Sequence, residues 1–206
     1  MRFATPLNIL LALLLCTASP ASAVVWFENG DAGELPAGHQ ATIGVGALTA
    51  ISGTIDNTSD RDLFCVRVVD QGLFFANLLC SGIPGLDLWL FSTTGLGLSH
   101  HDGCVGGFTT VSGAFKPGIG SYLLGISADG ADARNWLGQP IWSAGPVQAE
   151  RAPNGTGAPG PITSWAPQAP GATFTPYTIQ LTGCVPCDAV VSTRPRSWGT
   201  LKSHYR

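Results

Sequence analysis

The feature that most constrains this chain is a series of short apolar runs, each closed by a cluster of turn residues. No segment shows the sustained 3.6-residue apolar period and the caps of an amphipathic helix. Strand-like runs at this spacing, separated by Gly, Pro, Asn and Asp, are typical of an antiparallel β-sandwich. We therefore expect an all-β, antiparallel sandwich with seven main strands, at 47–55, 62–69, 73–80, 86–92, 106–115, 121–127 and 175–183.

The composition supports this fold class and excludes one class of partner. Charged residues make up only 11% of the chain, against about a quarter in typical proteins, while 27 Gly and 15 Pro supply turns. Residues 24–184 hold five basic against twelve acidic residues, a net charge of −7. Nucleic-acid binding needs a basic stripe, so the acidic body excludes a nucleic-acid partner.

The N-terminus has the pattern of a secretory signal. Arg2 precedes a short apolar run at 9–15, and "ASA" at 21–23 fits the small-x-small rule for cleavage. The apolar run is too short to span a bilayer. We expect residues 1–23 to be a signal peptide and the mature chain to be exported, whether outside the cell, on its surface or in the periplasm. A retained membrane anchor and lipid attachment at Cys16 are the alternatives.

The rest of the chain divides into a domain, a long loop and a tail. One domain is expected at 24–184, interrupted by a segment at 129–172 that is rich in Gly, Pro and Ala. Loops this long are usually functional or flexible. The tryptophans in it (Trp136, Trp142 and Trp165) indicate a loop that folds back over a sheet edge or an open end of the core. The alternative is an aromatic platform for a ligand.

Several motifs, in the right order, resemble one protein family. They are "WFENGDAGELPAGHQATIGVGALTAISGTI" at 26–55, "DRDLF" at 60–64, "LDLWLFSTTGLGLSHHDGC" at 86–104, "GSYLLGIS" at 120–127 and "TPYTIQLTG" at 175–183. Together they resemble the bacterial pre-peptidase C-terminal (PPC-like) domains. The resemblance implies a jelly-roll-like β-sandwich without catalytic activity, which aids secretion, folding or surface attachment. The sequence shows no attached peptidase domain.

A calcium site is the strongest chemical hypothesis, since some relatives in this family bind calcium. The candidate ligands are Glu28, Asn29, Asp31, Asp60 and Asp62, because Ca²⁺ requires several oxygen ligands. Residues two apart on a strand point to the same face, so Asp60 and Asp62 can present two carboxylates together. The alternative is that Asp60 forms a turn and Asp62 accepts loop N–H groups.

Alternation predicts the two faces of the strand that follows these acids. Phe64, Val66 and Val68 share one face, which we expect to be core, whereas Cys65 and Arg67 share the other. The same phase places Asp60 and Asp62 on the core side.

The cysteines predict disulfides in an exported chain. Five remain beyond the signal peptide, and an odd number leaves at least one thiol unpaired or bonded to another chain. Cys80 and Cys104 flank the strand at 86–92, and we expect them to pair. Cys184 and Cys187 form a C-x-x-C after the last strand, which we interpret as a local disulfide that closes the domain.

Two further features, a pair of adjacent histidines and a basic tail, can be explained without a catalytic or metal site. His100 and His101 are adjacent, so on a strand they point to opposite faces and do not share one ion, while the Asp102-Gly103 pair after them is a strong turn signal. The basic tail at 185–206 is either a solvated terminus or a sorting tag, since it resembles "WG-x-x-K-x-x-YR" tails of some exported bacterial proteins.

No paired carboxylates, nucleophile elbow or zinc signature occurs at a useful spacing. The sequence therefore predicts a non-enzymatic exported module with a binding or structural role. A cell-surface polysaccharide and another exported protein are the candidate partners, and calcium is the candidate cofactor. The alternatives are a carbohydrate-binding module that uses the loop tryptophans and an accessory domain of a secreted hydrolase system.

Overall fold

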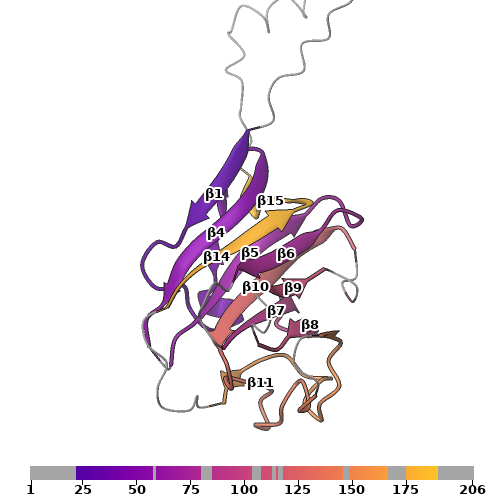
Figure 1. Ribbon diagram of the computed structural model, residues 1–206. Helices are drawn as coiled ribbons and strands as arrows, with labels where there is room; N and C mark the ends of the chain where they lie inside the picture. Colours follow the sequence, from indigo (N-terminus) through magenta and orange to yellow (C-terminus); the bar gives the residue numbers. More distant parts are fainter. Residues whose placement is uncertain are drawn as a thin grey trace, which may run out of the picture.

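The computed structural model of this protein describes residues 22–57, 59–79, 85–103, 108–112, 115, 118–145, 149–166 and 175–189. Residues 1–21 of the expected signal peptide (1–23), the expected Cys80–Cys104 bridge and the tail beyond residue 189 lie outside these residues, while Ala23 is the first residue of β1. The described chain is a β-sandwich (Figure 1), and its one helical element is a 3₁₀ turn, η1 (Pro36–Gly38). The expected fold class is therefore confirmed.

Two main sheets form the sandwich, and we name them sheet I and sheet II. Sheet I has the strand order β1-β4-β14-β6-β9, with bounds Ala23–Phe27, Ala47–Ile55, Thr175–Thr182, Phe75–Leu79 and Phe108–Val111. Sheet II runs β12-β8-β7-β10-β5-β15, with bounds Glu150–Arg151, Gly97–His101, Leu86–Ser92, Gly120–Ala128, Arg61–Val68 and Cys184–Pro186, and β2 (Gln40–Ala41) also pairs with β5.

The strand pairing differs from the purely antiparallel expectation. β1 runs parallel to β4, and β2 runs parallel to β5. Two small sheets complete the fold: β11 (Ala133–Arg134) pairs with β13 (Ser164–Trp165), and β16 (Asp188–Ala189) pairs with β3 (Ile43–Gly44). Because β15 and β16 still belong to sheets, the chain stays in the fold to residue 189, beyond the boundary expected at residue 185.

The main core lies between the two sheets. β5 contributes Phe64, Val66 and Val68 to it, as its alternation predicts, and β14 contributes Tyr177 and Ile179 from the opposite sheet. Apolar side chains that alternate along both sheets are removed from water together, which is the dominant stabilising contribution to such a fold.

A second core covers the outer face of sheet II. Residues 129–166, described except for 146–148, form what we call the loop layer, and it packs Trp142 and Ile162 against Trp89 and Phe91. Trp142 lies 5.2 Å from Trp89 and 5.7 Å from Phe91, measured between ring centroids. Gly97 makes room for this contact, because a side chain there would collide with the Trp142 ring. The loop therefore folds back onto the domain, but it covers the outer face of sheet II rather than the sheet edge or open core end that the sequence suggested.

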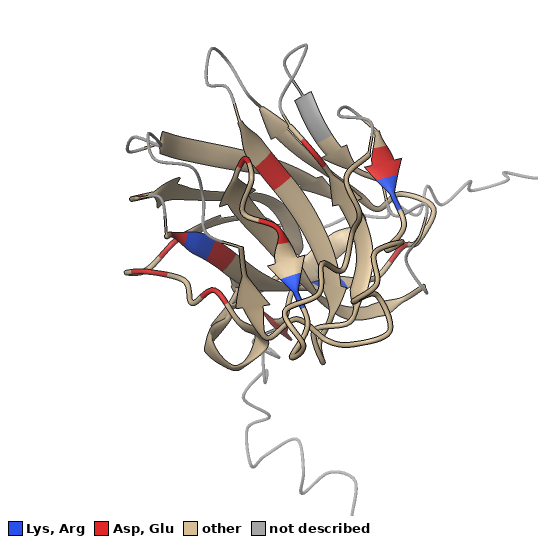
Figure 2. Cartoon of the chain, turned by 90° about the horizontal axis from the view of Figure 1, so that it is seen from below, with Lys and Arg blue, Asp and Glu red and all other residues tan. Residues whose placement is uncertain are grey.

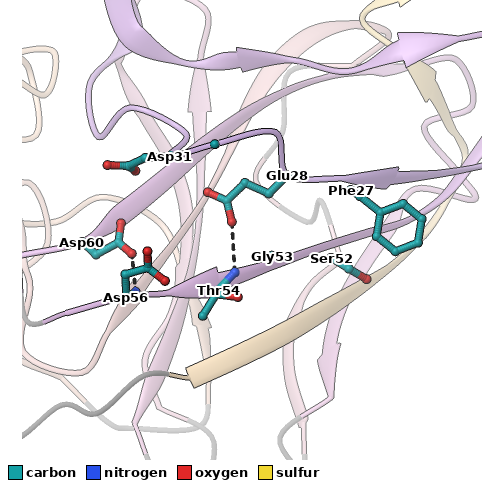
Figure 3. A pocket seen from close by; sticks show the side chains of 9 residues that line it. Phe27, Glu28, Asp31, Ser52, Gly53, Thr54, Asp56 and Asp60 are labelled. Atoms are coloured by element: carbon teal, nitrogen blue, oxygen red, sulfur yellow. Dashed lines mark hydrogen bonds between the residues drawn. The ribbon is translucent and has the colours of Figure 1, made fainter.

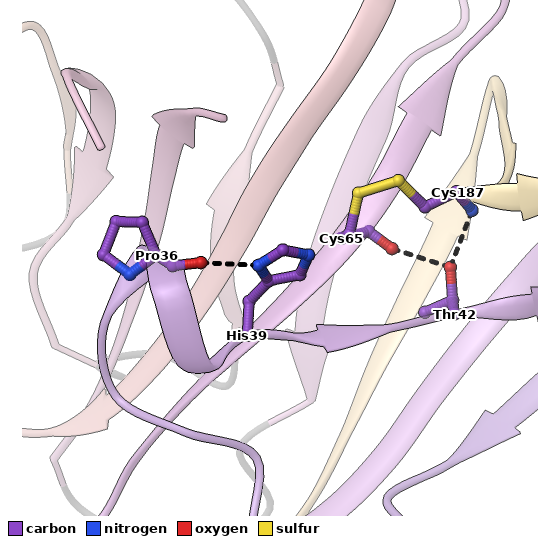
Figure 4. Close-up of a disulfide and its surroundings, with 5 residues drawn as sticks. All are labelled: Pro36, His39, Thr42, Cys65 and Cys187. Atoms are coloured by element: carbon purple, nitrogen blue, oxygen red, sulfur yellow. Dashed lines mark hydrogen bonds between the residues drawn. A yellow bond between two sulfur atoms is a disulfide. The ribbon is translucent and has the colours of Figure 1, made fainter. Parts of the chain in front are cut away.

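The disulfide expected between Cys184 and Cys187 is wrong. Cys187 forms a disulfide with Cys65 of β5 (Figure 4). Their Cα atoms are 5.5 Å apart, although the two residues are separated by 122 positions in sequence. Cys184 is free and buried. Cys184 belongs to the main core and Cys187 packs against the second core, so they lie on opposite sides of sheet II. Thr42 braces the bridge: its hydroxyl donates to the Cys65 carbonyl at 2.7 Å and accepts from the Cys187 N–H at 3.0 Å.

Candidate metal centre

Three of the five expected calcium ligands meet at one end of the sandwich. Glu28 directly follows β1, Asp31 lies in the loop before η1, and Asp62 lies in β5. One carboxylate oxygen of each lies within 4.8 Å of the other two. The pairing of β1 with β4 places Glu28 at this end of sheet I, and the packing of sheet I on sheet II brings it close to Asp62.

The Glu28 carboxylate is held in place by backbone donors. Its Oε1 accepts the Ala32 N–H at 3.0 Å. Its Oε2 accepts the Thr54 N–H at 3.0 Å, as Figure 3 shows. Gly53 is required beside it, because a side chain at that position would collide with both Glu28 Oε2 and the hydroxyl of Tyr177. The geometry of this carboxylate is therefore fixed by the local fold.

Asp62 is the buried member of the trio. Its side chain is fully inaccessible to solvent, and Oδ2 accepts the Tyr177 hydroxyl at 2.6 Å. Its Oδ1 is buried and receives no hydrogen bond from the described residues. Burial raises the pKa of Asp62 to about 9, although the Tyr177 hydrogen bond opposes this, and the negative charges of Asp60 and Glu28 raise it further. A buried carboxylate without a countercharge is costly, so this group requires either a proton or a cation.

The remaining two expected ligands are placed differently. Asp60 is buried but lies outside the trio, and its Oδ2 accepts the Asp56 N–H. Its pKa is raised by burial, with Asp31 and Glu28 adding to the effect. Asn29 is exposed, and its backbone N–H and C=O both bind the side chain of Gln40, at 3.1 Å each. Its backbone is therefore anchored on Gln40.

A pocket of about 540 Å³ opens beside these acids (Figure 3). Phe27, Ser52 and Thr54 line it together with Glu28, Asp31, Asp56 and Asp60. A second pocket, of about 520 Å³, also borders Asp31 and Asp60. Glu28 and Asp31 of the trio therefore line a hollow, whereas the buried Asp62 lines neither pocket.

A second carboxylate group, which the sequence did not suggest as a metal site, is formed by Asp87, Asp102 and Asp129. It differs from the first because it already has a cationic neighbour: Arg151 Nη2 lies 3.6 Å from Asp102 Oδ2. The Gly103 N–H also donates to Asp87 Oδ1 at 2.7 Å, while burial raises the Asp87 pKa well above its usual value. This group therefore has less need of an added cation than the trio.

The histidines have structural roles in β8. His100 stacks on Trp89 with ring centroids 3.5 Å apart, and burial lowers its pKa to about 2, with the nearby Arg151 charge adding to this. His101 pairs instead with Thr110 of sheet I, accepting from its N–H at 2.9 Å. The two rings point to opposite sides of the strand, as their adjacency predicts.

The loop tryptophans do not form a common platform. Trp142 is buried at 4% exposure, and Trp165 packs edge-on against Trp89 while its N–H donates to the Glu34 carbonyl at 2.7 Å. Only Trp136 presents most of its surface, 72%, to solvent. The three-tryptophan ligand site considered from the sequence is therefore wrong for Trp142, whose ring has no free face.

Comparison with known proteins adds no relative: no family model matches the chain, and no curated protein is similar to it. Within the described residues, no helix has the length and apolar character needed to cross a bilayer.

Proposed function

We propose that this chain is a non-catalytic, exported β-sandwich module in which a calcium ion fastens the N-terminal segment to the sandwich. The observation that carries the proposal is the buried carboxylate of Asp62: its Oδ1 has no hydrogen-bond partner among the described residues, and one of its two oxygens lies within 4.8 Å of a carboxylate oxygen of Glu28 and of Asp31. A bound cation would compensate the charge of all three groups.

The ligand chemistry favours calcium. The trio offers only carboxylate oxygens, which suit hard cations, whereas zinc and copper sites usually include His or Cys. Two oxygens that are each about 2.4 Å from one Ca²⁺ are at most about 4.8 Å apart, and the three oxygens meet this limit. Asp60 and water from the two adjoining pockets are available to complete the coordination of a large ion.

The site's position indicates a structural role. Glu28 and Asp31 belong to the segment between β1 and η1, and Asp62 belongs to β5 of the opposite sheet. An ion at this point would therefore link sheet I, sheet II and the loop between them. The PPC-like motifs and the signal-like residues 1–23 support an exported, non-catalytic module of this kind.

Calcium titration of the mature chain, residues 24–206, tests the proposal. In a thermal unfolding experiment, EDTA should lower Tm and added Ca²⁺ should raise it, since a ligand that binds only the folded state stabilises it. Asp62→Asn should abolish the response. Asp129→Asn is the matched control, because it removes one carboxylate from the second group and should leave the response intact.

An equal Tm in EDTA and in excess Ca²⁺ would contradict the calcium site. Loss of the response in Asp129→Asn but not in Asp62→Asn would move the site to the second group. For the non-catalytic assignment, the contradicting result is hydrolase turnover that disappears in His100→Ala while the variant stays folded.

A second candidate function, carbohydrate binding, is favoured by Trp136. The turn that carries this side chain is well fixed: Asn135 Oδ1 accepts the N–H groups of Leu137 and Gln139 at 3.0 Å each, and Arg134 donates to the Gly138 carbonyl at 2.7 Å. A rigid, exposed indole can stack on a sugar ring at low entropic cost. A polysaccharide pull-down in which Trp136→Ala binds as well as the unmodified chain would exclude this candidate.

A further inference from the structure

We propose that the outer face of sheet I is an interface between two copies of this chain. Sheet II has its outer face covered by the loop layer, whereas sheet I presents large apolar side chains to solvent on its outer face. Phe27 is 69% exposed, Val25 46%, Leu79 41% and Phe75 40%. Exposed apolar side chains gathered on one sheet face are a mark of interaction surfaces.

The strands that form this face carry no formal charge, and the acidic pocket borders it at Phe27 and Ser52. The five strands of sheet I contain no Asp, Glu, Lys or Arg, whereas sheet II contains Arg61, Asp62, Arg67 and Asp87 in its longer strands. Charged residues occupy few positions along the ribbon, which is mostly tan in Figure 2. Because residues 24–184 carry a net charge of −7, two copies meet with the least repulsion through their uncharged faces.

The centre of the face can pair with itself. Ser52 and Thr178 lie opposite each other on β4 and β14, with their hydroxyl oxygens 3.0 Å apart, and the exposed Gln180 follows on β14. Hydroxyl and amide groups both donate and accept hydrogen bonds. If a two-fold axis passes through this centre, the Ser52, Thr178 and Gln180 side chains of one chain contact the same side chains of the second chain. An isologous interface requires this arrangement.

The size of the face is sufficient for a specific contact. With strands about 4.8 Å apart and a rise of about 3.3 Å per residue, five strands of this length cover roughly 500 Å². Two copies would then bury roughly 1,000 Å² in total, which reaches the lower limit for a specific interface.

The chain's own C-terminal tail is a poorer occupant of this face. Residues 190–206 contain Arg194, Arg196, Lys202 and Arg206, together with Trp198 and Tyr205. The uncharged strands of sheet I offer no acidic partner to these four cations, so covering the face with the tail would desolvate charge without compensation.

Analytical ultracentrifugation of the mature chain tests this inference. The expected result is a concentration-dependent mass that reaches that of two chains, measured in excess Ca²⁺ because Phe27 and Ser52 of this face also line the acidic pocket. Gln180→Arg and Thr178→Arg should each weaken association at least about tenfold, since they place like charges opposite each other across the two-fold axis.

Thr163→Arg is the control, because Thr163 is exposed in the loop layer and far from sheet I in the strand pairing. This variant should dimerise like the unmodified chain. Circular dichroism and Tm confirm that each variant is folded, and either of the two β14 variants suffices if the other unfolds. A single-chain mass at all concentrations, or a dimer that is unaffected in a folded Gln180→Arg or Thr178→Arg variant, would overturn the inference.

Discussion

Asp62→Asn should make the metal-free protein more stable at neutral pH while it removes the response to calcium. Asp62 has a usual pKa of 3.8, and burial raises this to about 9 in the fold. Between these two values the unfolded chain has lost the Asp62 proton, whereas the folded chain retains it. The unfolded state thus binds fewer protons, so the free energy of unfolding falls as pH rises through this window.

The magnitude follows from the pH interval. Each pH unit between the two pKa values is worth about 1.4 kcal/mol, so the penalty at pH 7 relative to pH 4 is about 4 kcal/mol. Asparagine carries no such penalty, and its side-chain oxygen can still accept the Tyr177 hydroxyl that now binds Asp62 at 2.6 Å. The variant should therefore gain several kcal/mol at pH 7 in EDTA and little at pH 4.

Urea unfolding in EDTA at a series of pH values between 4 and 8 measures this effect, with the Ca²⁺ titration repeated at pH 7. Asp129→Asn serves again as the control for the Ca²⁺ titration, in which it should respond like the unmodified chain. The reasoning is refuted if Asp62→Asn is less stable than the unmodified chain in EDTA at pH 7, or if both lose stability in parallel between pH 4 and pH 7.

Three further predictions concern packing, the disulfide and the buried histidine. In urea unfolding, Trp142→Ala should lower the free energy of unfolding by about 3–5 kcal/mol because it leaves a cavity in the second core. Trp136→Ala, at an exposed position, should change it by less than about 0.5 kcal/mol. Equal effects of the two substitutions would contradict the packing of the loop layer. Cys187→Ser removes the disulfide to Cys65, 122 positions away, and should lower the free energy of unfolding by about 2–5 kcal/mol. In Cys184→Ser, peptide mapping should still find the Cys65–Cys187 disulfide. A Cys184–Cys187 disulfide peptide from the unmodified chain would contradict the observed pairing. His100 stays neutral in the folded chain because its pKa is lowered to about 2, whereas the unfolded chain takes up a proton there below about pH 6.5, so the free energy of unfolding falls as pH drops below that value. His100→Phe should reduce this decline. An unchanged pH dependence in the variant would contradict a buried, neutral His100 ring.

Much of the fold could be predicted because it depends on local patterns. The expected strands at 47–55 and 86–92 agree with β4 and β7 at both ends, and the expected strand at 175–183 ends one residue beyond β14. The faces of β5 followed from alternation alone, since the side-chain period of two is a property of any strand. The approach of Glu28, Asp31 and Asp62 to one another remained a hypothesis until the strands were placed.

The strands that were missed lack such a pattern. β8 contains Gly97, Ser99 and two histidines, so it does not alternate between apolar and polar residues, and the pairing with β7 and β12 holds it in sheet II. β15 has the sequence Cys184-Val185-Pro186 and shows no strand pattern of its own, yet it pairs with the edge of β5. Pairing with an existing edge can recruit a segment whose own propensity is weak.

By itself, the sequence determined the all-β class, the faces of the central strand and the set of acids from which a cation site could be built. Tertiary structure alone decided which of these groups meet. Cys187 binds Cys65 rather than its neighbour in sequence, and Trp142 is buried while Trp136 is exposed, although both lie in the same loop. The reason is that alternation and turn chemistry act over a few residues, whereas disulfide partners, a covered sheet face and a shared carboxylate cluster depend on contacts between segments that only packing brings together.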